Sequence, residues 1–190
     1  MSINLNKGAR VNLSKEVPNL KKIKMGLGWD TNRSDTGSNF DLDGSVFLVG
    51  RNGKTELDKN FVFYNNLHSS DKSVRHLGDN LTGEGAGDDE EILVDLSKVS
   101  SSVLEIIFVV TIYEAEQRRQ NFGQVSNALI RLVNEENKQE VLRYELDEDY
   151  STERAIEFGR LYRKENSWRF QAVGMGYDAG LQGFVDRYIG

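Results

Sequence analysis

The chain of 190 residues contains no cysteine. Without a thiol it can form no disulfide, thiolate zinc site or iron–sulfur cluster, and it performs no thiol redox chemistry of its own. It also has a single proline, so no proline-rich spacer divides it. We therefore expect one domain over residues 1–190, long enough to bury a substantial core without covalent staples.

Long apolar runs are missing as well. No stretch of eighteen apolar residues and no apolar segment near the first residue is present, so we expect neither a membrane span nor a signal peptide, and a cytoplasmic location. The net charge of −6 argues against non-specific nucleic-acid binding, which needs clustered basic residues. The short basic groups Lys21, Lys22 and Lys24, and Arg118 and Arg119, are interpreted as solvated strand ends or turns.

What the sequence does contain is short apolar runs at even spacing, which is typical of all-β proteins. Strands are predicted at 3–5, 10–13, 22–28, 40–49, 60–64, 92–96, 105–113, 125–133, 140–145 and 168–173. Residues 105–113 are apolar on both faces, so this strand should be central and buried on both sides. The prediction is a mainly-β fold, a two-sheet sandwich with one short helix from the C-terminal half packed on it.

That helix is predicted at residues 151–164. Ser151 or Thr152 could cap its N-terminus, and Ala155, Phe158 and Tyr162 recur at i, i+3 and i+7 to give one apolar face. The glycine-rich tail at 174–184 is expected to be irregular.

The most informative segment is residues 78–91, GDNLTGEGAGDDEE, with six carboxylates, four glycines and no basic residue. Two carboxylates about 6 Å apart repel by roughly 3 kcal/mol at an effective dielectric near 20. Glycines allow the backbone to curl so that the oxygens converge. The pattern indicates a bound hard cation, and calcium fits best because it accepts six to eight oxygen ligands. A solvated acidic loop that binds nothing is the alternative.

A second acidic pair lies in the predicted strand 40–49. Side chains alternate faces along a strand, so Asp41 and Asp43 should project the same way, about 7 Å apart. The fragment resembles the start of an EF-hand loop, but Val46 and Asn52 stand where that loop requires glycine and glutamate. We therefore reject an EF-hand and expect a cation held between strand-end loops.

Ten ordered motifs along nearly the whole chain resemble the TerD family of bacterial tellurite-resistance and general stress proteins. They are GLGWD (26–30), FDLD (40–43), FVFYNN (61–66), GDNLTGEG (78–85), GDDE (87–90), VTIY (110–113), QNFG (120–123), FGRLYR (158–163), WRF (168–170) and GMGY (174–177). Three positions depart from the family pattern: Leu81 replaces a common basic residue, Ala86 an acid, and Gly44 an alanine. The missing acid at position 86 bears on the number of bound ions.

The resemblance implies a calcium-binding β-sandwich with two neighbouring Ca²⁺ sites, linked to resistance to tellurite and other chemical stress. The candidate metal ligands are oxygen-bearing side chains, namely Asp30, Asp41, Asp43, Asp79, Asn80, Glu84, Asp88, Asp89 and Glu90. Asp30 could equally be a strand-end turn residue.

Other polar residues are weaker candidates. Asn65 and Asn66 could supply an amide oxygen but are more often turn formers. His68 and His76 lie in a polar stretch with no third histidine nearby, so both are predicted on the surface and a zinc site is not supported. Trp29, Trp168 and Phe170 are predicted in the core, and Tyr177 in loop packing.

The leading functional hypothesis is a non-enzymatic calcium-binding module that contacts other stress-response proteins, with the inner membrane surface as a further place of action. The alternatives are a metal-dependent phosphoester hydrolase and a calcium-dependent membrane-surface binder. Direct reduction of tellurite is disfavoured because the chain has no thiol. Some relatives are described as binding cyclic nucleotides, but the acid-lined glycine loop lacks a phosphate cradle.

Overall fold

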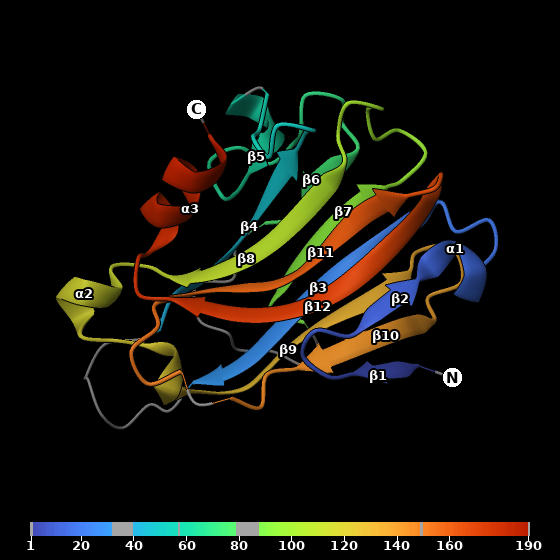
Figure 1. Cartoon of the computed structure of the whole chain (residues 1–190). Helices are drawn as coiled ribbons and strands as arrows, with labels where there is room; N and C mark the ends of the chain where they lie inside the picture. Colours follow the sequence, from blue (N-terminus) through green and yellow to red (C-terminus); the bar gives the residue numbers. More distant parts are fainter. Residues whose placement is uncertain (1, 32–39, 57, 79–87, 149, 190) are drawn as a thin grey trace.

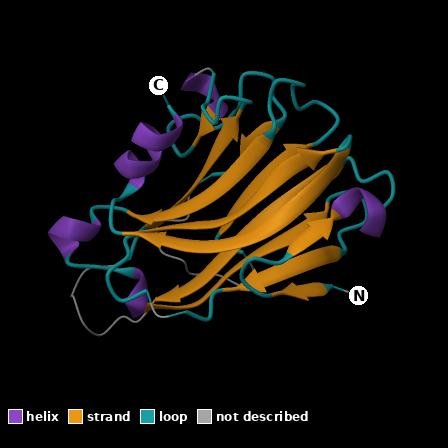
Figure 2. Cartoon of the chain, in the orientation of Figure 1, coloured by secondary structure: helices purple, strands orange, loops and turns teal. Residues whose placement is uncertain are grey.

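The computed structural model describes residues 2–31, 40–56, 58–78, 88–148 and 150–189. In these residues the strands form two six-stranded sheets that pack face to face (Figures 1 and 2). No helix in the described ranges has the length and apolar character needed to cross a membrane.

The first sheet has the strand order β1-β10-β9-β3-β7-β6. Its strands are β1 (Ile3–Leu5), β10 (Glu140–Glu145), β9 (Val125–Asn134), β3 (Lys22–Thr31), β7 (Glu90–Asp95) and β6 (Val74–His76). All neighbours are antiparallel except β1 and β10.

The second sheet has the order β2-β12-β11-β8-β4-β5 and is antiparallel throughout. Its strands are β2 (Arg10–Asn12), β12 (Ser167–Tyr177), β11 (Ala155–Lys164), β8 (Glu105–Ile112), β4 (Leu42–Val49) and β5 (Phe61–Val62). The short helices α1 (Leu13–Glu16), η1 (Asp58–Asn60), α2 (Ala115–Arg118) and η2 (Phe122–Gln124) lie at the margins of the strand layers (Figure 2).

The main core lies between the two sheets. Met25 and Leu27 from β3 meet Leu42 and Val46 from β4, and all are buried. A smaller apolar cluster covers the outer face of the second sheet, where α3 (Leu181–Tyr188) packs through Phe184 and Tyr188. Phe47 lies at its centre, 4.5 Å from the Phe61 ring centroid and 5.2 Å from that of Tyr188. The second sheet is thus covered on both faces.

The prediction of a two-sheet sandwich with one helix on it is confirmed, and β8 is the buried central strand that its composition predicts. The location of that helix was wrong. Residues 155–164 form the strand β11. The prediction failed because a strand buried on both faces loses the alternation of apolar and polar residues and can imitate helical spacing. The helix that packs on the sheet is α3, and the segment predicted as irregular contains the end of β12 and the start of α3.

Candidate functional site at the acid end

Most candidate ligands in the described ranges come from strand ends at one end of the sandwich, called here the acid end. The strand β3 ends beside the start of β7, where Asp89 N–H donates to the Leu27 carbonyl. The start of β4 joins them, because Gly44 N–H donates to Glu90 Oε2 over 2.5 Å. In Figure 1 these strand ends lie toward the lower left. Asp79, Asn80 and Glu84 fall outside the described residues.

The three consecutive acids at the start of β7 point in different directions. The Asp88 carboxylate occupies the space above Gly26, on the outer face of the first sheet, where a Cβ on that glycine would meet it at 2.0 Å. There it forms a two-pronged ion pair with Arg131, with N–O distances of 2.6 and 3.0 Å. The buried carboxylate of Glu90 points the opposite way, between the sheets.

Asp89 lies between them and accepts a hydrogen bond of 2.7 Å from Trp29 N–H. Burial raises the pKa of the Asp89 carboxyl above its ordinary value, and the negative charges of Asp30 and Asp88 add to this effect. The Trp29 hydrogen bond opposes the shift but does not cancel it.

Glu90 faces a buried histidine. His76 Nε2 lies 3.3 Å from Glu90 Oε2 and 3.2 Å from the Gly44 carbonyl, while His76 Nδ1 accepts from Gly78 N–H. The prediction that His76 is a surface residue was therefore wrong, whereas His68 is exposed as expected. Val74 and His76 both face the core from β6, but a three-residue strand gives too short an alternation to be recognised in the sequence.

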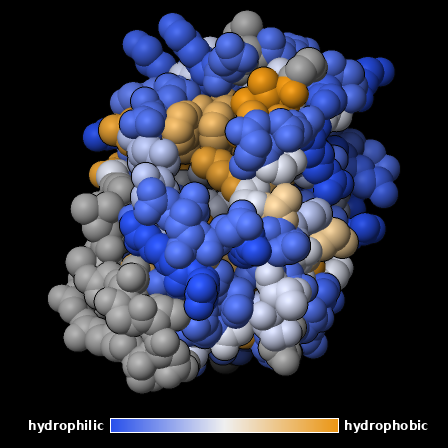
Figure 3. Space-filling view, turned by 90° about the vertical axis from the view of Figure 1, so that its left-hand side faces the viewer, coloured by the Kyte–Doolittle hydropathy of each residue, from blue (hydrophilic) through white to orange (hydrophobic). Residues whose placement is uncertain are grey.

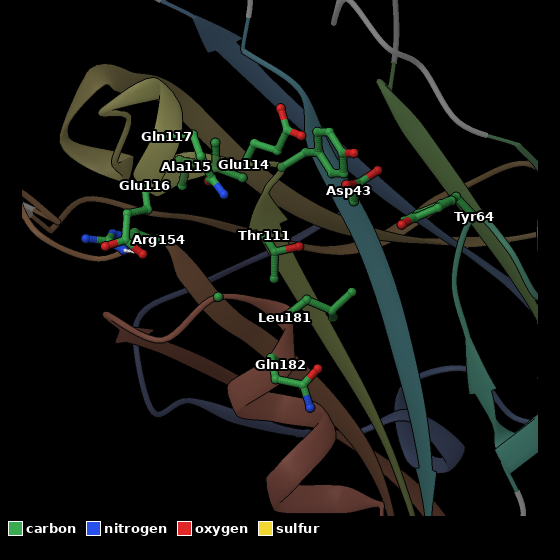
Figure 4. Close-up of a pocket in the computed structure, with 13 residues that line it drawn as sticks. Asp43, Tyr64, Thr111, Glu114, Ala115, Glu116, Gln117, Arg154, Leu181 and Gln182 are labelled. Atoms are coloured by element: carbon green, nitrogen blue, oxygen red, sulfur yellow. Dashed lines mark ion pairs between the residues drawn. The ribbon is translucent and has the colours of Figure 1, made fainter.

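Asp43 lies on the other side of β4. Gly44 faces Glu90, so its neighbour Asp43 points to the outer face of the second sheet, where only 6% of it is exposed. It lines a pocket of about 310 Å³ between β4, β8, α2 and the first turn of α3 (Figure 4). Asp41 is half-buried just before this strand, and its carbonyl accepts from Tyr113 N–H.

The pocket around Asp43 has mixed character. Thr111 is buried in its wall, and the rings of Tyr64 and Tyr113 are 37% and 42% exposed. Arg154 lies on the far side from Asp43 in Figure 4, 3.4 Å from Glu116. Figure 3 views this side of the molecule and shows an apolar patch within a mostly hydrophilic surface. No sequence pattern predicts this pocket, because its residues come from five separate segments.

The remaining candidates have structural roles in the described chain. Asp30 is exposed and accepts from the Asn127 side chain over 2.7 Å. Asn66 closes a turn, and its side chain donates to the Phe61 carbonyl over 2.6 Å, as expected of a turn former. Within the described ranges, no three histidine or acidic side chains converge closely enough to hold a metal ion.

Comparison with known proteins identifies the family. The model of the TerD domain matches residues 1–188. The chain belongs to the TerD family. It is 56% identical over 188 residues to Tellurium resistance protein TerD of Serratia marcescens, with 99% of this chain and 97% of the relative covered. It is 52% identical to General stress protein 16U of Bacillus subtilis (strain 168), with the same coverage of both chains.

The TerD-family fold is also found among solved structures. A homologue of telluride resistance protein (TerD) from Streptomyces coelicolor A3(2) superposes with a TM-score of 0.72 at 21% identity, covering 87% of this chain and 95% of that one. At this identity the likeness shows the fold alone. The sequence relatives carry the names of resistance and stress proteins, not of enzymes.

Proposed function

We propose that this TerD-family protein is a calcium-binding module, which acts in a cytoplasmic stress response through contacts with other proteins and not through catalysis. The observation that carries the proposal is the gathering of carboxylates from three strand ends at the acid end. The names of its relatives, in tellurium resistance and general stress, support the biological setting.

The chemistry of the donors fits a hard cation. The candidates offer oxygen, which calcium prefers. The only buried histidine of the described acid end, His76, has one ring nitrogen facing Gly78 N–H and the other facing the Gly44 carbonyl. It is therefore poorly placed to serve a softer metal.

The described residues would supply part of the ligand sphere. The segment that carries Asp79, Asn80 and Glu84 starts and finishes at the acid end, because Leu77 N–H donates to the Glu91 carbonyl and Asp88 lies over Gly26. We therefore assign these three residues to the same site as Asp88, Asp89 and Asp41, with about two ions bound. Glu90, which points between the sheets, and Asp43, which points to the outer face of the second sheet, stand outside this ligand sphere.

Bound calcium would supply positive charge to a region rich in carboxylates. The chain's own groups neutralise only part of this charge. Arg131 forms an ion pair with Asp88, but burial and the acidic neighbours keep the pKa of Asp89 raised. A cation at this end would relieve the repulsion and fix the strand ends relative to one another. The ordered surface is the part of the molecule that we assign to partner contacts.

Calcium titration tests the proposal. A ligand that binds only the native state adds RT ln(1 + [L]/Kd), about 2.7 kcal/mol at a hundredfold excess over Kd. For a chain of this size that corresponds to a rise in Tm of about 5–10 °C. Calorimetry should give about two ions per chain, with Asp89→Asn at least tenfold weaker in calcium affinity.

The matched control is Glu165→Gln, which removes one charge from an exposed turn remote from the acid end. Its calcium affinity should stay within twofold of the parent. A Tm that responds neither to millimolar calcium nor to chelator would contradict the proposal. The partner contacts are tested separately, by comparing pull-downs with and without calcium.

A further inference from the structure

A second pocket, of about 280 Å³, lies on the outer face of the first sheet, at the end of β3 and β7 remote from the acid end. Four basic residues line it, each from a different segment: Lys22 from β3, Lys72 from the turn before β6, Arg75 from β6, and Lys98 from the loop after β7. We call it the basic pocket. It stands out in a chain whose net charge is −6.

The two acidic residues of the basic pocket are already engaged. Asp95 accepts from Ser97 N–H and Ser97 Oγ and lies 3.6 Å from Lys98 Nζ. Glu135 pairs with Lys138. The positive charge of Lys22 also acts on Asp95, but within the described ranges no carboxylate lies within ion-pair distance of Lys22, Lys72 or Arg75. The pocket therefore presents more positive charge than its own acids compensate.

The walls of the basic pocket are held in place by one hydrogen-bond network around the half-buried Asp71. Asp71 accepts hydrogen bonds from Ser69 Oγ (2.7 Å), Ser73 N–H (2.9 Å) and Ser73 Oγ (2.6 Å), which fix the turn that carries Lys72. Its other oxygen accepts from Ser100 N–H over 2.9 Å and so ties this turn to the loop that carries Lys98. Burial opposes the shift, but these hydrogen bonds together hold the pKa of Asp71 below its ordinary value.

The basic pocket is electrostatically separate from the acid end. Lys22 lies opposite Asp95 in the sheet register, at the pocket. Gly28, at the acid end, is six residues further along β3, which is a distance of about 20 Å in a strand. The Debye length at physiological ionic strength is about 8 Å, so exposed charges so far apart are largely screened from each other. The carboxylates of the acid end therefore do not prevent an anion from binding here.

We propose that the basic pocket binds the phosphate group of a small organic ester. A phosphate carries up to two negative charges and several acceptor oxygens, which match donors that converge from four segments. The half-buried side chain of Leu93 lines the same pocket and offers contact to the organic part. A long polyanion such as nucleic acid is disfavoured, because its other phosphates would meet an acidic protein.

Calorimetric titration of the full chain tests this site. The probes are glycerol 3-phosphate and inorganic phosphate, at constant ionic strength and with EDTA present, so that the result does not depend on calcium. We expect saturable binding of one probe molecule per chain, with the ester tighter than inorganic phosphate because of Leu93.

The double variant Lys72→Gln/Arg75→Gln should bind glycerol 3-phosphate at least tenfold more weakly. Its matched control is Lys59→Gln/Lys164→Gln, which removes two exposed charges outside the pocket and should bind within twofold of the parent. Equal Tm values would show that both variants fold. No saturable binding of either probe, or an equal loss in the two double variants, overturns the proposal.

The phosphate affinity of Asp71→Asn distinguishes an organised binding site from a surface that is only positively charged. Removing a negative charge beside the pocket would strengthen phosphate binding if net charge alone mattered. Because Asp71 positions the turns of Lys72 and Lys98, we expect weaker binding, by at least threefold. Tighter binding in this variant would overturn the assignment of an organised pocket.

Discussion

Glu90 and Glu157 are both almost completely buried, with 2% and 0% of each residue exposed, but different groups face them. Glu157 lies in β11 beneath α3 and accepts from Arg160 Nε over 2.9 Å. Arg160 carries a permanent charge and also reaches Glu105 over 2.9 Å. Glu90 instead accepts from a backbone N–H and faces His76, which is charged only when protonated.

The comparison separates a carboxylate that holds the fold together from one that belongs to a site. At Glu157 the chain itself supplies the cation, although burial still raises the pKa of the Glu157 carboxyl above its ordinary value. At the acid end Asp88 is paired with Arg131, Asp89 accepts from Trp29 N–H, and Glu90 faces His76. This difference is what the proposed calcium would remove.

The largest expected effect is on stability, at Glu157. Glu157→Gln leaves Arg160 with only its half-exposed partner Glu105 and should destabilise the protein by about 3 kcal/mol, as measured by urea denaturation. Glu105→Gln is the control. The side chain of Glu105 is 37% exposed, so this substitution should lower the free energy of unfolding by less than about 1 kcal/mol. Equal losses in the two variants would contradict the distinction.

An intermediate effect is expected at the ion pair of the acid end. Arg131→Gln releases Asp88 from its only described cation, so calcium affinity should rise about fivefold, or about 1 kcal/mol. Arg143→Gln is the control: Arg143 is the register partner of Arg131 in β10, shares Glu140 with it, and binds Glu145 instead of Asp88. It changes the net charge equally, and calcium affinity should change less than twofold. An unchanged calcium affinity in Arg131→Gln would argue that the Asp88 carboxylate is not a ligand.

The sequence predicted the architecture well, because ten of the strands have an apolar pattern of their own. It failed at Ala155 to Lys164, where burial on both faces and the close contact of Gly159 with Phe170 conceal a strand. It also missed α3, a helix of eight residues that contains Gly183, a weak helix former. This helix is stabilised by the packing of Phe184 and Tyr188 in the outer cluster.

For the site, the sequence identified the candidate oxygen-bearing residues, but not the direction in which each carboxylate points. The motif FDLD predicts that Asp41 and Asp43 share one face of a strand, but Asp41 precedes β4 and Asp43 points to the outer face, under α2 and α3. Arg131 and His76 were not predicted as members because each lies far in sequence from the acid that it contacts. Such pairings depend on sheet register, which one sequence does not reveal.

The smallest expected effect tests whether Asp89 senses its acidic neighbours. A carboxyl whose pKa is raised in the folded state binds more protons there than in the unfolded chain, between its ordinary value of 3.8 and the raised one. Stability therefore falls as pH rises through this window, and the loss persists at higher pH. In EDTA, Asp89→Asn should remove that fall while an amide oxygen keeps the hydrogen bond to Trp29 N–H. Because water screens a half-buried group, the difference in Tm between pH 4 and pH 6.5 should change by only about 1–2 °C. Thermal melts across this range, with Asp178→Asn as an exposed control, would measure it. An unchanged slope would mean that neither burial nor the neighbouring acids raise the pKa of Asp89 in the folded state, and with it would go the electrostatic reason for placing a cation there.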